Sequence, residues 1–99
     1  MGNFAVSDSN FEEFIDSEEL SFVLFKTNMC DNCVTIMRIL RDFTILEAGV
    51  YFVDAMKDKD LVKKYSVKKV PTVIVFENGR IKDLVVGVTS RSSYSKFLK

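Results

Sequence analysis

Three short runs of apolar residues constrain the fold of this chain more than any other feature of its sequence. The runs are Leu20–Phe25, interrupted only by Ser21, Val50–Val53 and Val73–Phe76. A strand with one face in water alternates apolar and polar side chains, whereas a strand buried on both faces is apolar throughout. The runs therefore predict the inner strands of a sheet that is covered on both sides.

The segments between these runs have the apolar spacing of helices. The longest stripe consists of Cys33, Ile36, Met37, Leu40 and Phe43. We expect this helix to end near Ala48-Gly49, because glycine commonly follows a helix.

Three shorter helices are predicted from caps and apolar pairs. The first begins at a capping box formed by Ser9 and Glu12, and its apolar residues are Phe11, Phe14 and Ile15. The second begins around Asp58, and Leu61 and Tyr65 mark one of its faces. The last is capped by Ser90, and its Tyr94, Phe97 and Leu98 face inward.

Two further strands complete the predicted order. Asn3–Val6 is a short strand, and Asn78-Gly79 is a strong hairpin signal, after which Ile81–Val88 returns antiparallel. The order is β-α-β-α-β-α-β-β-α, which predicts an α/β fold of three layers with one mixed sheet. A chain of 99 residues leaves room for one core, so we expect residues 1–99 to form a single domain.

Charge and hydropathy exclude several classes of partner. The 14 basic and 14 acidic residues balance, and Asp58 and Asp60 are interleaved with the lysines of the segment 57–64, so we expect no nucleic acid partner. These lysines are Lys57, Lys59, Lys63 and Lys64. No apolar stretch approaches the length of about 18 residues that spans a membrane.

The N-terminus lacks the pattern of a signal peptide, so we expect a cytoplasmic protein. Thiols are kept reduced there, which argues against a structural disulfide as the reason for two closely spaced cysteines.

Those cysteines form the sequence Cys30-Asp31-Asn32-Cys33, at the point where a buried strand gives way to the longest helix. Cys33 belongs to the apolar stripe, and Cys30 precedes it by one turn, at the helix N-terminus. A slightly non-helical Cys30 brings the two sulfurs within bonding distance. The helix N-terminus favours a thiolate, so Cys30 is predicted to be the nucleophile and Cys33 the resolving cysteine.

Two other interpretations of the cysteine pair remain. The cysteines could be inert core residues, or they could hold a metal ion or iron–sulfur cluster shared between two chains. A single chain has no His and no third Cys with which to bind zinc.

The stretch Val67-Lys68-Lys69-Val70-Pro71-Thr72-Val73-Ile74-Val75-Phe76-Glu77-Asn78-Gly79-Arg80 resembles the thioredoxin signature. Together with Cys30, Cys33 and Gly87, the resemblance covers most of the chain. It implies a thioredoxin-like three-layer sandwich, a cis proline at Pro71 facing the cysteines, and a Val70 backbone free to pair with an extended substrate. It also implies a substrate groove rimmed by Met29, Val53, Val70, Pro71, Val86, Gly87 and Val88.

The chain also departs from the family pattern near the cysteines. Met29 and Lys26 occupy positions where thioredoxins usually carry Trp, and Asp31-Asn32 replaces Gly-Pro. Leu24 stands at the position of the usual buried Asp, and Val50 at that of its Lys partner. We expect Asp31, Asn32 and Lys26 to modulate the cysteines, with the Asp31 carboxylate opposing the thiolate.

These observations predict a protein-disulfide reductase that uses a reversible Cys30–Cys33 disulfide and no bound cofactor. The expected partners of this monomer are disulfide-containing client proteins, with electrons from an NADPH-dependent flavoprotein reductase or a low-molecular-weight thiol. Two alternatives stay open. A glutaredoxin-like, glutathione-dependent enzyme is disfavoured because Val86-Gly87-Val88-Thr89 replaces that family's Gly-Gly-Asp stretch. A non-catalytic module would use the Val70-Pro71 groove only to hold a client.

Overall fold

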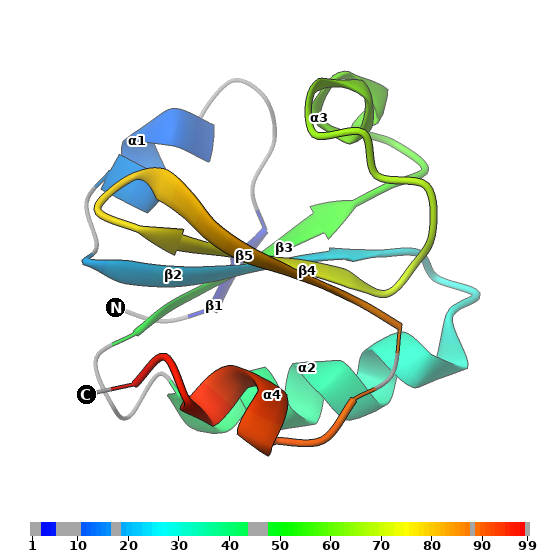
Figure 1. The fold of residues 1–99 in the computed structure, drawn as a ribbon. Coiled ribbons are helices and arrows are strands. Elements are labelled where there is room, and N and C mark those ends of the chain that lie inside the picture. Colours follow the sequence, from blue (N-terminus) through cyan, green and yellow to red (C-terminus); the bar gives the residue numbers. More distant parts are fainter. Residues whose placement is uncertain (1–2, 6–10, 17–18, 44–47, 88, 99) are drawn as a thin grey trace.

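The computed structural model describes residues 3–5, 11–16, 19–43, 48–87 and 89–98, and they form an α/β fold (Figure 1). The strands are β1 (Asn3–Ala5), β2 (Leu20–Lys26), β3 (Gly49–Asp54), β4 (Thr72–Glu77) and β5 (Arg80–Val86). The helices are α1 (Phe11–Asp16), α2 (Asp31–Phe43), α3 (Lys59–Lys64) and α4 (Ser92–Ser95). The order β-α-β-α-β-α-β-β-α predicted from the sequence is confirmed.

The sheet is mixed, with the strand order β1-β3-β2-β4-β5. β3 runs parallel to β1 and β2, whereas β4 runs antiparallel to β2 and to β5. Consequently β2, β3 and β5 all end at the edge of the sheet where β4 begins. The connection that carries Cys30 and the loop that carries Pro71 therefore lie at this edge.

Helices cover both faces of the sheet, α1 and α3 on one side and α2 and α4 on the other (Figure 1). Successive side chains of a strand point to opposite faces. On β2, Phe22 and Leu24 therefore join the core beneath α2, while Val23 and Phe25 join the core beneath α1 and α3. This division explains why the inner strands are apolar at nearly every position.

The hairpin between β4 and β5 has the turn that Asn78-Gly79 predicts. Asn78 has φ 52° and Gly79 has φ 82°, the positive values that a type I′ turn requires. A side chain at Gly79 would also collide with the carboxylate of Asp16. β5 ends at Val86, earlier than the predicted Val88, and Gly87 has left the strand with φ 84°. Val88, Val6 and the capping residue Ser9 lie outside the described residues.

One predicted helix boundary is wrong and one is left untested. The long helix was predicted to end near Ala48-Gly49; α2 is described as far as Phe43, residues 44–47 lie outside the described residues, and Gly49 begins β3, whose parallel ladder with β2 extends back to the pair Ser21–Gly49. Ser90 does not cap α4 with its side chain; its backbone carbonyl accepts a hydrogen bond from the Ser93 amide at 3.0 Å, and its hydroxyl pairs with that of Ser92. α4 begins only at Ser92, so Ser90 lies too far ahead of it to be the cap.

Candidate active site

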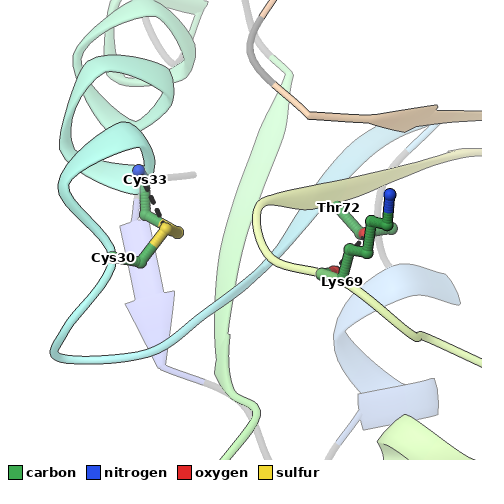
Figure 2. The surroundings of a disulfide bond; sticks show 4 residues. All are labelled: Cys30, Cys33, Lys69 and Thr72. Atoms are coloured by element: carbon green, nitrogen blue, oxygen red, sulfur yellow. Dashed lines mark hydrogen bonds between the residues drawn. A yellow bond between two sulfur atoms is a disulfide. The ribbon is translucent and has the colours of Figure 1, made fainter.

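The two cysteines lie at the junction between β2 and α2. β2 ends at Lys26, the chain turns at Asn28 and Met29, and Cys30 directly precedes the first residue of α2. Cys33 follows within the first helical turn. The two Cα atoms are 5.3 Å apart, and the sulfurs are joined in a disulfide (Figure 2).

The surroundings of the two sulfurs differ. Cys33 is 1% exposed, whereas Cys30 is only partly buried. The backbone amide of Cys33 donates a hydrogen bond to Cys30 Sγ at 3.1 Å. This amide lies in the N-terminal turn of α2 and also donates to the Cys30 carbonyl at 3.2 Å. The N–H groups of a helix N-terminus stabilise negative charge. In the reduced protein this amide would stabilise a thiolate on Cys30, as the predicted roles of the two cysteines require.

The loop that precedes β4 lies near the disulfide (Figure 2). Its Val70–Pro71 peptide bond is cis. Two hydrogen bonds hold the loop: Thr72 Oγ1 donates to the Lys69 carbonyl at 2.6 Å, and the Gly87 amide donates to the Pro71 carbonyl at 2.9 Å. No role was predicted for Thr72 from the sequence, although its position directly after the proline is a usable signal.

Most residues predicted to rim a substrate groove lie near this loop or near Cys30. Met29 is 93% exposed, Val86 is half-exposed, and Gly87, with φ 84°, faces open space. Val70 is partly buried, and within the described part of the chain its backbone groups form no backbone hydrogen bond. Pairing of an extended client segment with Val70 remains a prediction.

Val53 does not belong to this rim, contrary to the prediction. It is fully buried in the core beneath α1 and α3, because the alternation along β3 directs it inward together with Tyr51. Val88, also predicted for the groove, lies outside the described residues. Whether the remaining residues contact substrate stays a prediction.

The polar pair expected beneath a thioredoxin helix is replaced by apolar side chains. Leu24 is fully buried in the core below α2. The family pattern placed Val50 as its partner, but the parallel register pairs Leu24 with Phe52 and pairs Val50 with Phe22. No carboxylate or ammonium occupies any of these four positions.

The three residues expected to modulate the cysteines lie around Cys30. Asp31 and Asn32 are exposed in the first turn of α2. Lys26 is partly buried at the end of β2, and its carbonyl accepts a hydrogen bond from the Ala55 amide at 2.8 Å. Neither Lys26 nor Asp31 forms an ion pair with another described residue. The charge of Asp31 is therefore left to act on its neighbour Cys30.

The described ranges contain neither a metal-binding cluster nor a membrane-spanning helix. No group of three or more His, Cys, Asp or Glu side chains there could hold a metal ion. None of the helices there has the length and hydropathy needed to cross a membrane.

Comparison with known proteins decides the family. The family model for thioredoxin matches residues 3–99. The chain belongs to the thioredoxin family. It is 30% identical over 95 residues to a chloroplastic M-type thioredoxin of Pisum sativum, covering 92% of this chain but only 55%, about half, of that protein. A thioredoxin of Staphylococcus haemolyticus is 30% identical over 96 residues, with 94% of this chain and 91% of the relative covered. The solved structure of a mutant thioredoxin from Halobacterium salinarum NRC-1 superposes with a TM-score of 0.91 at 18% identity, over 98% of this chain and 88% of that one, which shows a shared fold.

Membership of this family determines the class of chemistry. Thioredoxins are protein-disulfide oxidoreductases that act on disulfide-containing substrates, and the Cys30–Cys33 disulfide is the redox couple that this activity needs. Neither the glutaredoxin-like alternative nor the non-catalytic module is favoured by these findings.

Proposed function

We propose that this protein is a monomeric cytoplasmic reductase of client-protein disulfides, with Cys30 as nucleophile and Cys33 as resolving cysteine. One observation carries the proposal most directly: the accessible sulfur of the couple receives a helix-terminal N–H at 3.1 Å, while its partner is 1% exposed. An accessible thiolate can meet a protein substrate, and a shielded one is kept for the second step.

The proposed reaction has two exchange steps. The Cys30 thiolate attacks one sulfur of the client disulfide, forms a mixed disulfide, and releases the other client sulfur as a thiolate that takes up a proton. Cys33, after losing its own proton, attacks Cys30 Sγ and releases the second client thiol. Two electrons pass to the client, and the protein is left with the Cys30–Cys33 disulfide.

The reduced Cys30/Cys33 dithiol carries the two electrons, so the proposed cycle uses no bound cofactor. Return to the dithiol requires an external donor, which we propose to be an NADPH-dependent flavoprotein reductase or a low-molecular-weight thiol. Either donor would approach through the same opening at Cys30, next to the exposed Met29 and the Val70-Pro71 loop.

Reduction of insulin disulfides tests the proposal. The wild-type protein should reduce insulin catalytically in the presence of dithiothreitol, and Cys30→Ser should abolish catalysis. Cys33→Ser should also stop turnover but should accumulate a mixed disulfide at Cys30, detectable by non-reducing electrophoresis and mass spectrometry. Thr35→Ser, a substitution at an exposed position of the same helix, is the control and should keep the wild-type activity. Catalysis retained by Cys30→Ser, or a mixed disulfide trapped at Cys33 instead, would contradict the assignment.

A further inference from the structure

A pocket of about 260 Å³ lies beside the Pro71 loop, between the α3–β4 connection and β5. Six of the residues that line it are Ser66, Lys68, Lys69, Thr72, Leu84 and Val86. Nothing in the local sequence predicted this pocket, because its two walls are separated along the chain and meet only through the β4–β5 pairing.

One wall of the pocket is positively charged. Lys68 and Lys69 are both exposed, and neither forms an ion pair within the described ranges. By contrast, Lys64, Lys82 and Arg91 are paired with Glu12, Glu77 and Asp42. Among the described residues, no acidic side chain lines the pocket. Its unpaired ammonium groups therefore favour an anionic occupant.

The opposite wall is apolar. Leu84 and Val86 are each 47% exposed and are the register partners of Ile74 and Thr72 on β4. Strand alternation places both on the face of the sheet that carries α1 and α3, yet they remain uncovered. A side chain that combines an aliphatic stem with a terminal carboxylate matches both walls, and glutamate has this form.

The pocket is continuous with the surface proposed to bind clients. Val86 belongs to both, Lys69 directly precedes Val70, and the Gly87 amide is bonded to the Pro71 carbonyl. The Lys69 side chain points away from the sulfurs (Figure 2). A client strand paired with Val70 would therefore reach the pocket with a residue close to, but not at, its reacting cysteine.

We propose that this pocket selects clients that carry a glutamate near the cysteine attacked by Cys30. The inference rests on the proposed reductase function and adds a substrate preference to it. Exposed ion pairs change binding by at most about fivefold each, so we expect a preference of that order and not an absolute requirement.

The test compares disulfide-bonded peptides that differ at a single position. Glu, Gln or Lys is placed in turn at each of the three positions on either side of the cysteine, and kcat/KM is measured. At one position or more we expect kcat/KM to fall in the order Glu, Gln, Lys, with a difference of about fivefold between the Glu and Lys peptides. Lys68→Glu/Lys69→Glu should invert this order. Raising the salt concentration should compress it, because exposed charges are screened.

A matched control separates the pocket from net charge. Arg38→Glu/Lys96→Glu makes the same change in net charge at exposed residues of α2 and the segment after α4, on the other face of the sheet, and should keep the Glu preference. Circular dichroism checks that both variants fold, and Lys69→Gln, a milder change, should reduce the preference. The proposal would be overturned if the wild-type protein reduced all the peptides at equal rates. It would also be overturned if Arg38→Glu/Lys96→Glu inverted the preference as strongly as Lys68→Glu/Lys69→Glu. Failure of the wild type to reduce any peptide would instead reject the reductase function.

Discussion

At the scale of single residues, two groups act on Cys30 in opposite directions. The Cys33 amide, 3.1 Å from Cys30 Sγ, stabilises a negative sulfur. The carboxylate of Asp31 is adjacent in sequence, exposed, and free of any ion pair within the described residues, so it destabilises that charge. The balance between them affects how readily the disulfide is reduced.

Asp31→Asn should make the reduction potential less negative, because it removes a charge that disfavours the thiolate of the reduced form. Two charges a few ångströms apart in a water-like medium interact by about 1 kcal/mol or less, which corresponds to about 20 mV or less for a two-electron couple. Equilibration against glutathione at pH 8.5 should show the shift, and it should shrink as the pH is lowered and the thiolate is protonated.

Asp60→Asn is the matched control, since it removes the same charge from an exposed position on α3. It should leave the potential close to that of the wild type. An Asp31→Asn potential that becomes more negative, or one that Asp60→Asn reproduces, would show that the local charge argument is wrong.

At the scale of elements, α2 joins the redox couple to the core. Four of its residues are buried on one side of the helix: Cys33, Ile36, Leu40 and Phe43. Their spacing is the apolar stripe identified in the sequence. The helix that presents Cys30 is therefore held in place chiefly by the side chains that follow Cys33.

Leu40→Ala should lower the free energy of unfolding by about 2–5 kcal/mol, because it leaves a cavity at a fully buried position in the core below the sheet. Urea unfolding followed by circular dichroism measures the loss. Thr35→Ala, at an exposed position of the same helix, should change stability by only about 0.5 kcal/mol or less. Similar losses in the two variants would mean that α2 is not anchored through this stripe.

At the scale of the whole molecule, contacts distant in sequence join the helices on the other face. Lys64 Nζ on α3 is 2.9 Å from Glu12 Oε1 on α1. Beneath them the ring of Phe11 contacts the rings of Tyr65 and Phe76. The hydrogen bond and charge of Lys64 lower the pKa of Glu12 below its ordinary value of 4.5.

This lowered pKa predicts a pH-dependent contribution to stability. A carboxyl group with a lowered pKa in the folded state stabilises above its unfolded pKa, and the contribution is lost as the pH falls through the folded pKa. Glu12→Gln should therefore be less stable than the wild type at pH 7, with the difference closing as the pH falls below the ordinary value of 4.5 and through the lowered pKa of the folded state. The effect should be small, because both groups are exposed.

Urea unfolding across this pH range measures the difference. Glu13→Gln, at the next exposed position of α1, forms no ion pair in the part of the chain that is described and should follow the wild-type profile more closely. A Glu12→Gln deficit that stays constant down to pH 3 would contradict the role of the ion pair.

The sequence by itself determined what depends on near neighbours in the chain. The apolar runs of the inner strands, the stripe of α2, the turn at Asn78-Gly79 and the placement of Cys30 ahead of Cys33 all follow from local spacing and backbone preference. The family resemblance in the Val67–Arg80 stretch added the thioredoxin fold, and the comparisons confirmed it.

The tertiary structure decided what depends on strand register and packing. Register placed Leu24 and Val50 in the same apolar core below α2, and alternation along β3 buried Val53 instead of exposing it to a client. The bond from Gly87 to Pro71 and the pocket between Lys69 and Leu84 join segments that are far apart in the sequence. Such neighbours are fixed only when the strands pair, because a shift of one residue turns every side chain to the opposite face.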